Sequence, residues 1–370
     1  MVAALIVGGH LSSIPGNVRN SSLSASLLTS DDGANGSQPR MPMPAPRGPV
    51  SAALAELLLD LDGPAEPLSA AVAAHRSPVL DDEDAQLTLT MLYELHLRGI
   101  RGVDDRAEWD VRLLEVRGEL EQRLESELNA LVGPIEDPDD VVEALFQASA
   151  DDDGPPLAAF LARSGTVDQF RELVIHRSLN QLREADVHTL GIPRLGGAPK
   201  AALIEVQSDE YGGGRLDYMH ATLWADLMRG MDLDSGYAAY IDSIPAPTLA
   251  AVNTLSYFGL HRGRVRELVG HLCMVETTSS LPSRQYSRGL RRLGFGRPVR
   301  LFFDEHVEAD AVHEQLVVRE VAGALGDTPD GRIGLLRGAL TCLAVERLAA
   351  QHIWAAWEAG RSSLRVGSAR

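Results

Sequence analysis

The sequence predicts an all-α protein, and three observations support this prediction. Hydrophobic residues make up 45% of the 370 residues and aromatic residues only 5%, with Ala and Leu abundant, which is typical of packed helices. From Ala52 onward, apolar residues recur at the spacing of three and four residues that places them on one face of a helix. No stretch alternates convincingly between apolar and polar residues, so we expect no sheet.

The chain divides into three predicted regions. Residues 1–50 are rich in Ser, Gly, Asn and Pro, and we expect them to form a disordered N-terminal segment. Residues 51–150 are expected to form a smaller helical region. The acidic run at 151–156 is the best candidate for a linker. Residues 155–370 then form an almost unbroken series of helices, separated by glycine and proline residues.

The clearest helix of the second region is predicted to run from about Asp105 to Val132. Its apolar residues recur at helical spacing and would face the core. They are Trp109, Leu113, Leu114, Leu120, Leu124 and Leu128.

Charge and cysteine content exclude several classes of function. The net charge of −18 repels nucleic acids and anionic membranes, so neither is an expected partner. Cys273 and Cys342 both lie in apolar surroundings, which favours buried thiols over a disulfide. So few cysteines fit a reducing compartment, and no apolar run is long enough to cross a bilayer. We therefore expect a cytoplasmic protein.

Three residues near the C-terminal end of the chain have the spacing of a metal half-site. His306, Asp310 and His313 are four and three residues apart, which places them on one face of a helix. Two imidazoles and a carboxylate supply the nitrogen and oxygen donors that suit iron, manganese or zinc. The sequence therefore predicts a metal site on this helix.

A site for two metal ions would need further donors from other helices. Glu276 follows an apolar helix, where an unpaired carboxylate would be costly. His220 lies on an apolar helix face, where a histidine that only fills the core is the commoner outcome. Glu210 precedes it, but the glycines at 212–214 interrupt any single helix between them. The spacing alone leaves their contact open.

In order, these six residues resemble the ligand series of the haem-oxygenase-like diiron oxidases and oxygenases. The segments 210–215, 276–282 and 302–314 also resemble the iron-containing redox enzymes of that family, and the resemblance covers about residues 165–365. It implies a haem-oxygenase-like helical bundle preceded by a smaller helical segment that forms a homodimer. It also implies two Fe ions (Fe2+/Fe3+), O2 as co-substrate and an external reductant.

The resemblance also suggests how the ligands are distributed. We expect Glu210, His220 and His313 at one iron, and Glu276, His306 and Asp310 at the other, with Glu210 or Glu276 as the bridge. The Glu210–His220 spacing is closest to the N-oxygenase subgroup, which has an extra carboxylate on an earlier helix. Glu184 lies at the corresponding distance and is a possible seventh ligand.

The function that the resemblance implies is N-oxygenation of an amine or guanidine of a small amino-acid-like substrate in specialised metabolism. An alternative within the family is oxidation of a C–H bond by a decarboxylase or desaturase of an amino or fatty acid. In that case Arg284 and Arg288 are candidates for binding the substrate carboxylate. Outside that chemistry, a haem-degrading oxygenase and a non-catalytic helical binding module of the same fold stay open.

Overall fold

The computed structural model describes residues 39–365, except for the side chains of residues 308–312. The all-α prediction is confirmed: the described residues form helices and no strand, and two of them, Met41 and Ile100, form one isolated bridge. Within this part of the chain, no helix combines the length and the apolar character that a membrane span requires.

The segment predicted to be disordered is only partly described. Residues 1–38 lie outside the described residues, whereas residues 39–50 are packed against the rest of the chain. The Met41 side chain is fully buried, and its backbone exchanges hydrogen bonds with Gly99 and Arg101. For residues 39–50 the prediction of disorder is therefore wrong.

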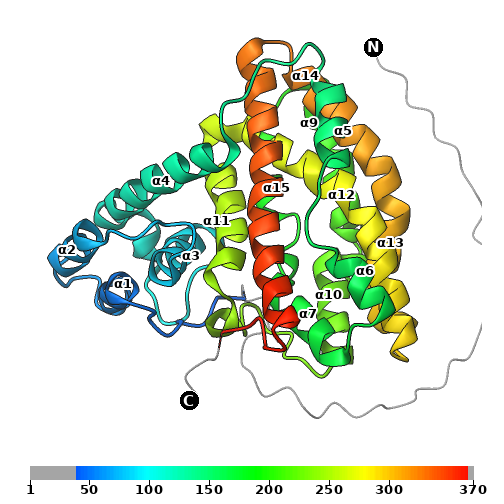
Figure 1. Ribbon diagram of the computed structural model, residues 1–370. Helices are drawn as coiled ribbons and strands as arrows, with labels where there is room; N and C mark the ends of the chain where they lie inside the picture. The colour runs from blue at the N-terminus through cyan, green and yellow to red at the C-terminus, as the bar shows by residue number, and fades with distance from the viewer. Residues whose placement is uncertain (1–38, 366–370) are drawn as a thin grey trace, which may run out of the picture. The chain divides into compact units, whose positions relative to one another are not determined.

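Five α-helices form the N-terminal part of the described structure (Figure 1). They are α1 (Pro49–Leu59), α2 (Glu66–Ala74), α3 (Glu83–Leu97), α4 (Val111–Val132) and α5 (Val141–Ala150). The long helix predicted from Asp105 begins later, because Asp110 adopts an extended backbone and caps α4 with its side chain. The preceding turn is a short 3₁₀ helix, which leaves Trp109 exposed rather than on the apolar stripe.

The larger helical bundle follows, and α5 belongs to it in space, because α5 packs against the two longest helices of the bundle (Figure 1). Its helices are α6 (Leu157–Arg163), α7 (Val167–Gln181), α8 (Asp186–Thr189), α9 (Gly197–Glu210), α10 (His220–Gly230), α11 (Ala246–Leu260), α12 (Val265–Arg292), α13 (Arg297–Gln315), a π-helix (Leu316–Ala322), α14 (Gly323–Leu325) and α15 (Pro329–Glu358). Helices α12 and α15 are the longest and lie against each other. Two glycines permit this approach: a Cβ on Gly270 would lie 1.9 Å from the Leu335 carbonyl oxygen, and one on Gly338 would lie 2.0 Å from the Glu267 carbonyl oxygen.

The two predicted helical regions share a hydrophobic core. One cluster of buried side chains includes residues of α1, α3 and α4 together with residues of α7, α11 and α15. A buried ion pair also joins them, since Arg183, just after α7, donates to Glu94 of α3 over 2.7 Å. The N-terminal helices are thus in direct contact with the segment that carries Glu184.

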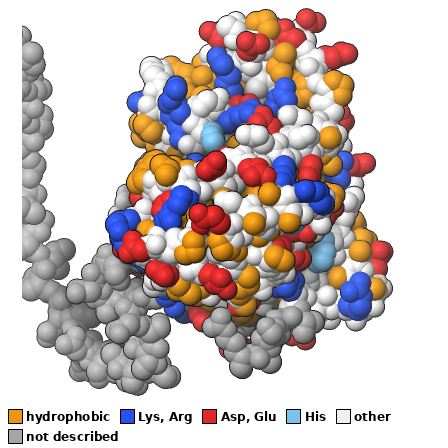
Figure 2. Space-filling model, turned by 90° about the vertical axis from the view of Figure 1, so that its left-hand side faces the viewer, with side chains coloured by type: hydrophobic (Ala, Val, Ile, Leu, Met, Phe, Trp, Pro, Cys, Tyr) orange, Lys and Arg blue, Asp and Glu red, His pale blue; other side chains and the backbone are white. Residues whose placement is uncertain are grey.

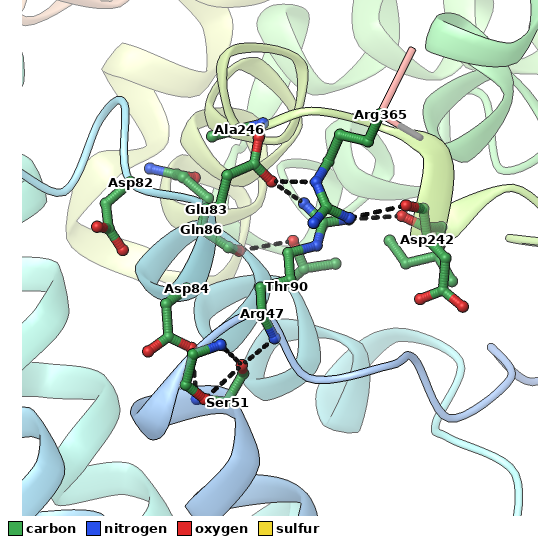
Figure 3. Close-up of polar contacts among 12 residues, drawn as sticks. Arg47, Ser51, Asp82, Glu83, Asp84, Gln86, Thr90, Asp242, Ala246 and Arg365 are labelled. Carbon is green, nitrogen blue, oxygen red and sulfur yellow. Dashed lines mark hydrogen bonds and ion pairs between the residues drawn. The ribbon is translucent and has the colours of Figure 1, made fainter. Parts of the chain in front are cut away.

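Polar contacts tie the two ends of the described chain to the start of α3 (Figure 3). Glu83 accepts from Arg47 over 2.6 Å and from Arg365 over 2.9 Å. Its other oxygen accepts from the backbone of Ala246, the first residue of α11. Arg365 also donates to the carbonyl oxygen of Asp242. One carboxylate therefore connects the segment before α1 with α3, α11 and the C-terminal segment.

Charges on the surface are mixed. On the face turned to the viewer in Figure 2, acidic and basic side chains are interspersed rather than gathered by sign. This face gives no continuous basic patch of the kind that binds nucleic acid.

Candidate metal centre

Residues from five parts of the bundle meet at one site. Glu210 is the last residue of α9 and His220 is the first residue of α10. The connection between them turns back on itself, because Gly212, Gly213 and Gly214 all have positive φ, and a Cβ on Gly212 would lie 2.5 Å from the backbone of Tyr218. This turn places His220 Nδ1 2.9 Å from Glu210 Oε2. The glycines that interrupt the helix are what bring these two side chains together.

The first cluster of donors combines Glu184, Glu210, His220 and His306. Each offers one ligand atom, and these atoms all lie within 4.8 Å of one another. His306 Nε2 is 3.6 Å from Glu184 Oε1, and the rings of His220 and His306 are 4.4 Å apart. Glu184, which follows α7, thus belongs to this cluster, and its role as a seventh ligand stays a prediction.

The second cluster combines Glu210, Glu276 and His313. His313 Nδ1 lies 3.5 Å from Glu276 Oε2 and 3.8 Å from Glu210 Oε1. Glu210 belongs to both clusters, with one oxygen facing His220 and the other facing His313. Of the two carboxylates predicted to bridge the metals, the geometry favours this one.

The predicted pairing of the ligands is wrong in this structure. His306 lies with His220 rather than with Glu276, and His313 lies with Glu276 rather than with His220. His306 and His313 are seven residues apart on α13, so they share a helix face but sit about 10 Å apart along it. Each therefore reaches a different cluster. The side chain of Asp310 lies outside the described residues, so its predicted ligand role stays a prediction.

Neighbouring groups orient the site residues. His306 Nδ1 donates to the carbonyl oxygen of Phe302 over 2.7 Å, which leaves Nε2 directed at the first cluster. His313 Nε2 donates to Asp209 over 3.1 Å, which leaves Nδ1 directed at the second cluster. Gln181 donates to Glu184 over 2.6 Å. Asp209 was missed in the sequence, although its position next to Glu210 was a usable signal.

The protonation equilibria show how strongly the charges interact. Burial disfavours the carboxylate of Glu210, but His220, followed by His306 and His313, lowers its pKa to about 2. Burial also opposes the protonation of His313, yet Glu276, Asp209 and Glu210 raise its pKa to about 9. Burial likewise opposes protonation of His220, and Glu210 raises its pKa. Metal ions would replace these protons on binding.

The donor chemistry fits a first-row metal such as iron. Glu210, His220, Glu276, His306 and His313 are all less than 9% exposed. Imidazole and carboxylate are the donors of non-haem iron sites in helical bundles, and a carboxylate shared by two clusters is suited to bridging two metals.

Residues 171–347 match the family model described as iron-containing redox enzyme. The match covers somewhat less than half of the chain and contains all the donors of both clusters. It supports iron as the metal and redox chemistry as the activity. No curated protein matches the chain.

A cavity of about 520 Å³ adjoins the first cluster. Its wall includes Glu184, Glu210, Glu276 and His306, and it continues along α7, α11, α12 and α15. Its apolar lining includes Leu173, Val187, Val252, Leu255, Leu272, Tyr286, Phe302, Phe303 and Ile353. This volume and lining are typical of a pocket for a small organic molecule.

The two arginines predicted to bind a substrate carboxylate do not line this cavity. Arg284 and Arg288 are exposed on α12, whereas their neighbours Ser283, Gln285 and Tyr286 form the cavity wall. Neither arginine would therefore contact a substrate bound in this cavity, and their role in substrate binding stays a prediction. A helical residue two or three positions from a cavity-lining one can face away from it.

Three further buried histidines, His176, His188 and His271, line the cavity, and the last two are in contact with each other. His188 Nε2 and His271 Nδ1 are 3.2 Å apart, so one ring donates a hydrogen bond to the other. Burial lowers the pKa of His188 to about 4, although Glu210 opposes this, and burial lowers the pKa of His271 as well. Both imidazoles are therefore neutral at physiological pH. His188 follows Glu184 by four residues, a helical spacing that could have drawn attention to it.

Proposed function

We propose that the protein is a non-haem diiron oxidase or oxygenase that uses O2 to oxidise a small organic substrate. The observation that carries this proposal is the shared position of Glu210 between two buried clusters of carboxylate and imidazole donors beside the cavity. Two iron ions held there would supply the electrons that reduce O2. The family match is consistent with this redox role.

The protein side chains would perform three tasks. Glu210 would connect the two metals, while Glu184, His220 and His306 complete one site and Glu276 and His313 the other. Asp310, on the same face of α13 as both histidines, would supply a further carboxylate. The Phe302 carbonyl and Asp209 would keep the two α13 imidazoles in the tautomers that present the unprotonated nitrogen to the metals.

The apolar part of the cavity would keep water from the reacting atoms. Phe302 and Phe303 are almost fully buried and stack edge-on to Trp224, which is also buried. Leu272 continues this wall on α12. Excluding water limits side reactions and strengthens electrostatic interactions inside the site.

Within this function, we favour N-oxygenation of an amine or guanidine of a small amino-acid-like molecule. The Glu210–His220 spacing and the position of Glu184 support it, and the carboxylates of the wall, including Glu346, would attract a cationic nitrogen. The apolar side chains of the cavity favour the second candidate, oxidation of a C–H bond of an amino or fatty acid. Comparing amines and fatty acids as accelerators of O2 uptake would separate the two.

The test of the diiron proposal is metal content after anaerobic loading with Fe2+, followed by O2 uptake. The wild type should bind about two irons per chain. His306→Ala and His313→Ala should each lose about one, Asp310→Ala should fall below two, and Glu210→Ala should lose most of both. His261→Ala is the matched control, because His261 is half-exposed and pairs with Glu121 away from the site. At most one iron in the wild type, or full occupancy in Glu210→Ala, would refute the proposal.

The external reductant and the homodimer are parts of the same proposal. Large apolar side chains exposed in the N-terminal helices support an association there, among them Leu59, Trp109 and Val111. Light scattering of the full chain should give twice the monomer mass, and a monomer at micromolar concentration would contradict the dimer.

A further inference from the structure

Arg177 lines the cavity, and none of the described carboxylates forms an ion pair with it. It lies on the face of α7 that lines the cavity, one helical turn before Gln181. Protein surrounds it, since burial is the largest influence on its pKa, although Tyr286, Glu346 and Glu184 raise that pKa overall. Its side chain nevertheless has an exposed surface. Arg177 thus lines the cavity with a side chain that stays accessible.

The other arginines of the cavity wall are neutralised. Arg183 donates to Glu94, and Arg347 pairs with Asp152 and Asp153. Among the described residues, the contact of Arg177 is with the ring of Tyr286, whose centroid is 5.9 Å from the guanidinium carbon. No described carboxylate comes within ion-pair distance of it. Within the described part of the chain, Arg177 therefore carries a positive charge that no direct ion pair neutralises.

We propose that Arg177 binds the carboxylate of the substrate. This inference rests on the proposed function, because it takes the cavity as the substrate site. A guanidinium presents two parallel N–H groups that match a carboxylate, and in a cavity this pairing is stronger than on the surface. Glu346 and Glu184 act on Arg177 electrostatically. They would repel a doubly charged phosphate more strongly than a singly charged carboxylate.

The position of Arg177 also restricts the shape of the substrate. Arg177 lies four residues, about 6 Å along the helix axis, before Gln181, the last residue of α7, and Glu184 of the first cluster lies beyond that end. A substrate with its carboxylate at Arg177 would therefore present to the metals a group several bonds away from that carboxylate. The substrate class is an organic carboxylate oxidised remotely from the carboxylate, at an amine, a guanidine or an alkyl carbon.

The test compares two probes that differ in charge but share one alkyl chain, octanoate and octanamide. Their binding is measured by calorimetry on the full chain, without metal and after loading with redox-inert Zn2+. The variants are Arg177→Gln and Arg177→Lys, and Arg288→Gln is the matched control because it removes an arginine outside the cavity. Circular dichroism and metal content establish that each variant is folded and loaded.

We expect the wild type to bind octanoate at least 10-fold more tightly than octanamide. Arg177→Gln should weaken octanoate by about 30-fold or more, as expected when one partner of a desolvated charge pair is removed. The same variant should leave octanamide unchanged. Arg177→Lys should recover part of the affinity, and Arg288→Gln should behave as the wild type.

Three results would overturn the inference. The first is an equal affinity of Arg177→Gln and Arg288→Gln for octanoate, and the second is that the wild type does not bind octanoate. The third is that Arg177→Gln loses bound metal but keeps its affinity for octanoate. The last result would make Arg177 a positioning residue for Glu184. Failure of the diiron proposal is distinguishable, because it would appear as missing metal in the wild type while octanoate still binds the metal-free chain.

Discussion

Replacing Glu94 with alanine should lower the free energy of unfolding by about 3–5 kcal/mol, because it would leave Arg183 charged and buried without its counter-charge. The two side chains are 1% and 2% exposed, and their closest atoms are 2.7 Å apart. The Tyr237 hydroxyl, which donates to the same Glu94 oxygen over 2.9 Å, would lose its acceptor as well. Burial raises the pKa of Glu94 even though Arg183 lies beside it. The attraction to Arg183 therefore does not fully offset the cost of removing the Glu94 carboxylate from water.

Urea unfolding followed by helical circular dichroism would measure this loss. The matched control is Glu119→Gln on α4, since Glu119 forms a half-exposed ion pair with Arg123. It should cost no more than about 0.5 kcal/mol. The double variant Glu94→Leu/Arg183→Met removes both charges and should recover most of the stability. A loss below about 1 kcal/mol in Glu94→Ala would refute this account of the pair.

Three further predictions concern packing, pH and thiol reactivity. Gly270→Ala should lower the free energy of unfolding by about 1–3 kcal/mol, because the added Cβ meets the backbone of α15. The control Gly118→Ala, with open space on α4, should raise the free energy of unfolding by about 0.5–1 kcal/mol. Equal effects of the two substitutions in urea unfolding would contradict this prediction. In the metal-free protein, the raised pKa of His313 contributes stability that is complete below pH 6.5 and is lost as the pH rises through about 9. The thermal midpoint of the wild type should therefore fall between pH 6.5 and about 9, and that of His313→Asn should fall less. Parallel curves of thermal midpoint against pH would contradict this role of His313. Burial raises the pKa values of the Cys273 and Cys342 thiols. A thiol reagent should therefore label neither cysteine in the native protein and both in denaturant. Fast labelling of the native protein would contradict this prediction, because it would show that the thiols are accessible.

The sequence was sufficient for the helical class and for most site residues, because both follow from local spacing. His306 and His313 could be placed on one helix face from their separation alone. Their partners could not be assigned, since that depends on how α12 and α13 lie against α9 and α10. The turn through Gly212 shows most clearly what the sequence could not predict. The glycines indicated that the helix is interrupted between Glu210 and His220. The positive φ angles of the turn, which only the structure shows, bring the two side chains together.

The substrate-binding arginine illustrates a second limit. α12 has neighbours on several sides, so its sequence does not tell which arginines face an interior cavity. Arg284 and Arg288 were chosen there and lie outside. Arg177 lies on α7 shortly before the turn that carries Glu184, and this closeness in the chain was a usable signal. The caution is that this argument depends on already knowing that Glu184 belongs to the site.

Because Glu210 serves both clusters, the two metal-binding steps would form one linked equilibrium rather than two independent ones. An ion in either cluster would fix the carboxylate that the other cluster also uses, and the change in affinity would be the same in both directions. An intrinsic dissociation constant for a single site would then have no fixed value in this chain. Each constant would depend on how full its neighbour is, and the supply of iron would set the proportion of complete centres as a whole.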